Sequence, residues 1–233
     1  MKTLNAEFLT NRDIEILKIA ANFGGKVYDE TLIKTLWINH TNAKRQVLNR
    51  MYILKNRYKV FNIKATGLTK PRSAFVLTDF GKALVYDLFE KKIGSMNITT
   101  TSVYHTILEQ ITFFWLNKIG KKLERTSVIK WSKEHSHTPD FVYYIDNNPE
   151  KMVYVEVERM RKSSYTQIFV NFVKDNVYKV LYVVENEKRL CQFAKCLPRS
   201  ERLMLVTIDE LIRNAQNGKI GAKKQKEIEN ECK

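Results

Sequence analysis

Apolar residues recur every three to four positions through the first ninety residues, which is the period of amphipathic helices. A first helix is expected to begin after Thr10, because Asp13 stands three residues further on and completes a capping box. Two more helices are expected over about 29–37 and 41–55, with Thr41 as the cap of the third. The chain therefore opens with three short helices joined by turns.

The third of these helices has an apolar side and a polar side. Its inward-facing positions are predicted to be Val47, Leu48, Met51 and Leu54. Its exposed positions are predicted to carry amide and basic side chains, namely Asn42, Lys44, Arg45 and Asn49. Such a helix would pack on one side and offer hydrogen-bond donors and positive charge on the other.

The period then changes to the alternation that is typical of strands. Two strands are predicted over 58–63 and 73–77, and the basic residues along this hairpin are Lys64, Lys70 and Arg72. Thr78 is placed to cap a fourth helix over about 79–92. Residues 94–102 are polar and without period, so they are expected to form a linker.

The second half of the chain alternates helical and strand patterns. A helix is expected over 104–119, with an apolar stripe of Ile107, Leu108, Ile111, Phe114 and Trp115. A strand that includes Trp131 follows, then strands around Asp140 and Glu156, and then a helix, strand, helix and strand over 164–175, 177–184, 187–197 and 203–208. This order predicts an α/β sandwich with a central mixed sheet, so the fold class is α/β, or α+β for the whole chain.

Three carboxylates interrupt the apolar strands of that sheet. Pro139-Asp140 opens one strand, and Glu156 and Glu158 stand in the next, between valines. Side chains alternate along a strand, so the two glutamates share one face. Buried charge is costly unless it is paired or metal-bound, and carboxylates from neighbouring strands commonly hold Mg²⁺. The alternative is a strand face that is open to solvent.

The charge of the chain favours a polyanionic partner. Lys and Arg number 40 against 25 Asp and Glu, for a formal net charge of +15. The excess is uneven, since residues 1–95 hold 17 basic and 8 acidic side chains. The balance is typical of proteins that bind nucleic acid, although a Lys- and Asn-rich proteome would also produce it.

Several classes of protein are disfavoured. The polar N-terminus does not resemble a secretory signal, and no window reaches transmembrane length, so a cytoplasmic protein without a membrane partner is expected. Cys191, Cys196 and Cys232 are odd in number and lack metal-site spacing, which predicts reduced thiols. No glycine-rich phosphate loop is present, so no nucleotide cofactor is expected.

Residues 8–93 resemble the winged helix-turn-helix family, on the pattern of three helices and a basic hairpin. The segment from Phe75 to Lys82 looks like the family's strand-to-helix junction. The resemblance implies that the third helix enters the major groove of double-stranded DNA and that the wing touches the backbone or minor groove. Arg50 is expected to help meet phosphate, and the predicted DNA-binding residues are Asn42, Lys44, Arg45, Asn49, Lys64, Lys70 and Arg72. A protein-interaction module of the same fold is the alternative.

The second half resembles the PD-(D/E)XK nuclease superfamily, since Pro139-Asp140 matches its PD and Glu156-Val157-Glu158 fills the second motif. Glu109 matches an additional acid on the first helix, while His105, four residues earlier, is interpreted as a helix-start residue. The resemblance implies Mg²⁺ or Mn²⁺ held by Glu109, Asp140 and Glu156, and catalytic positions at Asp140, Glu156, Glu158 and Lys162. Glu158 stands where the family has Lys. Some active members also have Glu there, others use a displaced Lys, a role that Lys162 or Arg159 could take here, and others are inactive.

A third resemblance covers most of the chain and is to the plasmid replication-relaxation family. Its residues are Tyr104-His105-Thr106-Ile107-Leu108, Trp131, Thr138-Pro139-Asp140-Phe141 and Tyr154-Val155-Glu156-Val157-Glu158-Arg159. It implies a DNA-binding protein of a plasmid or other mobile element that acts in replication, relaxation or mobilisation, with metal-dependent nicking of DNA as a candidate activity. A non-catalytic origin-binding or transcriptional regulator remains the alternative, with the nuclease-like fold as scaffold or homodimerisation domain. The expected domains are 1–94 and 103–212, with a basic flexible tail over 213–233.

Overall fold

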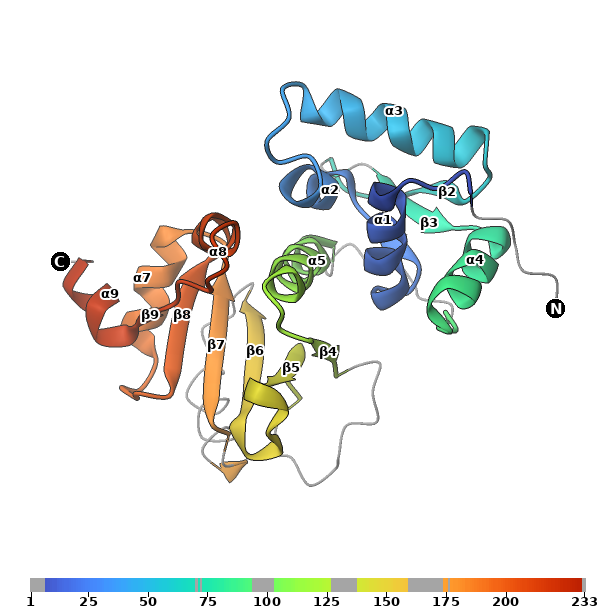
Figure 1. The fold of residues 1–233 in the computed structure, drawn as a ribbon. Coiled ribbons are helices and arrows are strands. Elements are labelled where there is room, and N and C mark those ends of the chain that lie inside the picture. Colours follow the sequence, from blue (N-terminus) through green and yellow to red (C-terminus); the bar gives the residue numbers. More distant parts are fainter. Residues whose placement is uncertain are drawn as a thin grey trace. The chain divides into compact units, whose positions relative to one another are not determined.

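The structure is a computed structural model of the 233-residue chain (Figure 1). It describes residues 7–69, 71, 73–93, 103–126, 138–158, 174–175 and 177–231. The chain divides into two units, Met1–Ile111 and Thr112–Lys233, and the division falls inside helix α5 (Val103–Lys118). The expected linker over 94–102 lies outside the described residues. No helix in the described parts has both the length and the apolar character that crossing a bilayer requires.

The N-terminal unit combines helices with a three-stranded antiparallel sheet. Its elements before α5 are α1 (Asn11–Asn22), β1 (Lys26–Val27), α2 (Asp29–Thr35), α3 (Ala43–Asn56), β2 (Phe61–Ala65), β3 (Ser73–Leu77) and α4 (Asp79–Phe89). Strand β3 lies in the middle of the sheet, between β1 and β2. The helices and the hairpin stand close to their predicted positions, whereas the two-residue strand β1 was not predicted, because it is too short to show a period.

A buried carboxylate joins α1 to α3. Asp13 accepts a hydrogen bond from the backbone N–H of Thr10 at 2.7 Å, and the Thr10 hydroxyl accepts from the Asp13 N–H at 3.3 Å. These bonds confirm the predicted capping box. The same carboxylate, which is fully buried, accepts from both Nε and Nη2 of Arg50, and this bond raises the pKa of the Arg50 guanidinium. Arg50 was expected to meet phosphate, but it is engaged inside the unit.

Helix α3 departs from the prediction at its start and on one flank. It begins at Ala43 and not after a Thr41 cap, because Asn42 adopts the left-handed conformation with φ 61° and its side chain makes no cap bond. Val47, Met51 and Leu54 are buried as predicted, but Leu48 is 44% exposed. Successive residues of an α-helix are rotated by 100° about its axis, so Leu48 lies on a different flank of α3 from Val47.

The hairpin is closed at its base by α4. Thr78 caps this helix as predicted, since its hydroxyl accepts from the Gly81 N–H at 3.0 Å, and it donates to the carbonyl of Lys59 at 2.6 Å. A Cβ at Gly81 would lie 2.3 Å from the carbonyl oxygen of Val60, so glycine is required there. Lys59 has φ 57°, a break in extended backbone that explains why β2 begins later than predicted.

The C-terminal unit is built on a six-stranded mixed sheet, which confirms the predicted central mixed sheet. Its elements after α5 are β4 (Glu124–Arg125), β5 (Phe141–Tyr144), the 3₁₀ turns η2 (Ile145–Asn147) and η3 (Pro149–Lys151), β6 (Met152–Glu158), β7 (Lys179–Val184), α7 (Glu187–Cys196), β8 (Leu203–Thr207), α8 (Ile208–Ala215), β9 (Lys223–Lys224) and α9 (Gln225–Glu231). The strands follow one another in chain order across the sheet. Strand β7 is parallel to both β6 and β8, and the other pairs are antiparallel. Trp131 and most of the predicted 164–175 helix lie outside the described residues.

Helices α7 and α9 cover one face of this sheet. Tyr154, Tyr182 and Phe193 belong to a core cluster that includes Ile228 of α9, so α7 and α9 cover this face. The Tyr154 hydroxyl donates to Asp175 at 3.2 Å, and burial together with that carboxylate raises the pKa of Tyr154 well above its usual range. Neighbouring strand residues point to the opposite face.

Residues 213–231 are folded and do not form the predicted flexible tail. Arg213 lies within α8, β9 pairs with β8, and Ile228 of α9 is fully buried. Lys223 bonds Glu231 at 2.7 Å and lies 3.4 Å from Glu210. The excess of polar residues suggested a solvated end, but one buried isoleucine and a strand pair hold the segment in place.

The cysteines differ from one another. Cys191 in α7 is disulfide-bonded, so the prediction of reduced thiols is wrong for this residue. Cys196, five residues further along the same helix, has a free and exposed thiol. Disulfide pairing depends on which segments the fold brings together, and spacing along the sequence does not reveal it.

Replacing Arg50 should destabilise the chain because it would leave the buried Asp13 carboxylate without its counter-charge. We expect Arg50→Ala to lower the free energy of unfolding by about 3 kcal/mol in urea denaturation. The matched control is Lys18→Ala, which removes a solvent-exposed pair with Glu15 and should cost less than about 1 kcal/mol. Equal losses in the two variants would contradict the role of the buried pair.

Candidate functional site

The register of β5 and β6 places Asp140 beside the carboxylate strand. Phe141 pairs with Val155, so the preceding residue, Asp140, lies next to Glu156 and Val157. The Val157 N–H donates to Asp140 Oδ2 at 2.8 Å. A backbone donor on the neighbouring strand therefore fixes the orientation of the Asp140 carboxylate.

Helix α5 supplies two more polar groups. His105 and Glu109 stand four residues apart on one side of the helix, with Nε2 and Oε1 separated by 3.8 Å. Glu109 is only 3% exposed, although it is a carboxylate. Phe113, one turn further along, lies against Phe141 with ring centroids 6.1 Å apart.

The structure brings His105, Glu109 and Asp140 together. Ligand atoms of the three side chains all lie within 4.8 Å of one another. An imidazole nitrogen and two carboxylate oxygens form a donor set that suits a divalent cation, and a mixed nitrogen and oxygen set accepts Mn²⁺ as well as Mg²⁺. A divalent cation could therefore be held by this group.

The group differs from the predicted metal set of Glu109, Asp140 and Glu156. Glu156 is 7% exposed, but it is not one of the three side chains that converge. Glu156 and Tyr154 point to the same face of the sheet. Val155 and its partner Phe141 point to the opposite face, where Phe113 of α5 lies against Phe141. Asp140 precedes β5 and is not bound by this alternation.

His105 joins the group although sequence reasoning interpreted it as a helix-start residue. The signal that could have found it is its spacing of four residues from Glu109, which puts both on one helix face. The predicted catalytic residue Glu158 ends β6, and its side chain lies outside the described parts, as do Arg159 and Lys162. The predictions for these three stay as they were.

The predicted DNA-binding residues of α3 form one exposed surface, which we call the α3 surface. Asn42, Lys44, Arg45 and Asn49 are all exposed and, with Leu48, line a hollow of about 390 Å³. Lys64 is exposed on β2, whereas Lys70 and Arg72 lie outside the described residues. Within the described residues, Lys44, Arg45 and Lys64 have no carboxylate at ion-pair distance. Three cationic groups of the N-terminal unit are thus available to a partner.

No family model matches this chain, and neither the curated proteins nor the solved structures contain a match to it. Its function must therefore be argued from these two groups of residues.

A divalent cation should stabilise the protein through the His105–Glu109–Asp140 group. We expect millimolar Mn²⁺ or Mg²⁺ to raise the melting temperature, because a ligand that binds only the folded state adds to its stability. Asp140→Asn and Glu109→Gln should abolish the rise, since each keeps the shape and removes an anionic ligand. The control Asp146→Asn changes an exposed carboxylate of η2 and should leave the rise intact.

Glu156→Gln distinguishes between the two metal sets in the same measurement. If the rise survives this substitution, the cation is held by the three residues that the structure groups. If it disappears as it does in Asp140→Asn, the set predicted from sequence is the correct one.

Proposed function

We propose that this chain is a DNA-binding protein whose N-terminal unit is a winged helix-turn-helix reader of double-stranded DNA. The order of elements supports the proposal, since helices α1, α2 and α3 are followed by the β2–β3 hairpin and β3 lies between β1 and β2. In folds of this kind the third helix enters the major groove and the hairpin lies beside it.

The observation that carries the proposal is the α3 surface. Its lysine and arginine are unpaired within the described residues, and its two asparagines offer both donors and acceptors. Unpaired cations favour phosphate, and amide side chains suit base edges. Arg50, by contrast, is engaged by Asp13 and is left out of the proposed interface.

We further propose that the protein serves a plasmid or other mobile element in replication, relaxation or mobilisation of DNA. This part rests on the resemblance of the Tyr104–Leu108, Thr138–Phe141 and Tyr154–Arg159 motifs. The alternative is a non-catalytic regulator that binds an origin or operator, with the second unit as scaffold or homodimerisation domain, and it keeps the same DNA-binding surface.

Metal-dependent DNA nicking is the second candidate function, and the His105–Glu109–Asp140 group favours it. Asp140 and Glu109 would hold Mg²⁺ or Mn²⁺, and the Val157 N–H would keep Asp140 in place. A bound cation would supply charge neutralisation at the scissile phosphate and acidify an attacking water. The strand order, with β5 and β6 antiparallel and β7 parallel to β6, agrees with a PD-(D/E)XK-like domain.

A supercoiled-plasmid assay tests the second candidate. Wild-type protein with Mn²⁺ should convert supercoiled plasmid to the relaxed circle, and Asp140→Asn should not, while both should bind the plasmid equally. Asp146→Asn serves again as the control and should nick normally. Binding without nicking in the wild type would leave the non-catalytic regulator as the function.

Loss of two charges from the α3 surface should weaken DNA binding. We expect Lys44→Ala with Arg45→Ala to lower affinity for duplex DNA several-fold and to reduce the slope of log K against log salt by about 2, since each phosphate contact contributes about 0.9. The matched control is Lys188→Ala with Lys195→Ala, which removes two exposed charges from α7. A gel-shift titration in which both double variants behave alike would reject α3 as the reader.

A further inference from the structure

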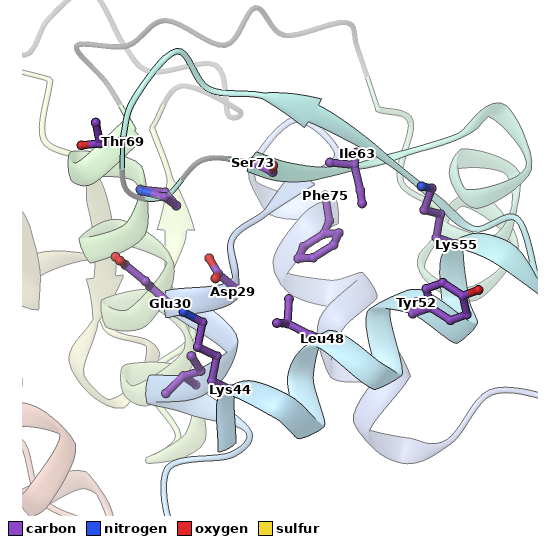
Figure 2. Close-up of a pocket in the computed structure, with 12 residues that line it drawn as sticks. Asp29, Glu30, Lys44, Leu48, Tyr52, Lys55, Ile63, Thr69, Ser73 and Phe75 are labelled. Carbon is purple, nitrogen blue, oxygen red and sulfur yellow. The ribbon is translucent and has the colours of Figure 1, made fainter. Parts of the chain in front are cut away.

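A second hollow lies on the flank of α3 that faces the hairpin (Figure 2). It measures about 780 Å³ and is bounded by α2, α3 and the β2–β3 hairpin. Leu48 from α3 and Ile63 and Phe75 from the hairpin point into its centre, as Figure 2 shows. Leu48 is 44% and Ile63 46% exposed, so apolar surface is left open to water. Gathered apolar surface with a charged rim marks a binding site.

The rim of this hollow carries charges in a definite order. Lys44, Leu48, Tyr52 and Lys55 follow one another at helical spacing along one side of α3. The two lysines stand about 16 Å apart along the helix axis. Within the described residues neither is paired with a carboxylate. The α2 end is acidic, since Asp29 and Glu30 line it.

This order matches the major groove of DNA. The groove is about 12 Å wide, so lysines some 16 Å apart can reach phosphates on both of its walls, while the two side chains between them, Leu48 and Tyr52, face the base edges. Asp29 and Glu30 repel phosphate oxygens and leave the apolar centre to uncharged groups. Among the base edges in that groove, the apolar group is the C5-methyl of thymine.

We propose that the hollow is a thymine-reading site in which Leu48, backed by Ile63 and Phe75, takes the C5-methyl group. The inference rests on the proposed DNA binding and adds a sequence preference to it. Lys44 and Lys55 contribute affinity without sequence preference, because phosphates are the same at every base pair. Leu48 therefore determines the sequence preference. Its apolar surface, which water contacts in the free protein, is covered in the complex.

The test compares thymine with uracil, which lacks only the methyl group. Duplexes are selected from a randomised pool with the full chain, and the selected duplex is resynthesised with uracil at each thymine in turn. At one position or more, uracil should lower the affinity of the wild type about four-fold, the amount that one buried methyl supplies. Leu48→Ala should bind the thymine and uracil duplexes equally.

Leu88→Ala is the matched control, because Leu88 lies on α4, is 36% exposed and does not line the hollow. It should keep the four-fold preference, and so should Leu48→Met, which retains an apolar side chain and guards against a folding defect. If no duplex is selected above background, the proposed DNA binding fails and the thymine site with it. If a duplex is selected and the wild type binds its uracil forms as tightly, DNA binding stands and the thymine site is refuted.

Discussion

The cost of burying a carboxylate governs how both units are built. Asp13, Glu109 and Glu156 are almost completely removed from solvent, and an ionised carboxylate there is unfavourable unless donors or cations surround it. Asp13 meets this requirement within the chain, through the Thr10 backbone N–H and the Arg50 guanidinium. The pair fixes α1 against α3, and with them the direction in which the polar side of α3 faces.

Glu109 meets the same requirement in another way. Its neighbours include His105 on its own helix and Asp140 at the head of β5, and this set combines an imidazole with a second carboxylate. An arginine, as at Asp13, makes a structural pair, whereas clustered acids with a histidine make a place for a divalent cation. The difference between a structural carboxylate and a candidate catalytic one thus lies in the partners, since both are buried.

The α3 surface and the hollow beside it divide the proposed recognition of DNA between two kinds of chemistry. In that proposal Lys44 and Arg45 supply positive charge that attracts any duplex. Leu48 and Ile63 leave apolar surface in contact with water, and covering it with an apolar group of the DNA would be favourable. Leu48 and Ile63 are both partly exposed beside the buried ring of Phe75. The proposed thymine site gives this apolar surface an occupant.

The sequence by itself determined the elements whose causes are local. The Thr10–Asp13 capping box, the helical period of Val47, Met51 and Leu54, and the alternation around Glu156 all act within a few residues, and each was predicted correctly. The tertiary structure decided which side chains meet across elements. Arg50 was predicted to contact phosphate, but it is the partner of Asp13. Leu48 was predicted to face inward, but it is exposed, and His105 lies with Glu109 and Asp140. Arg213 and Ile228 were placed in a folded segment where the composition suggested a tail. These contacts could not be predicted because periodicity shows only which way a residue faces on its own helix or strand. Contacts between elements depend on how helices and strands pack, and packing brings together residues that are far apart in the chain.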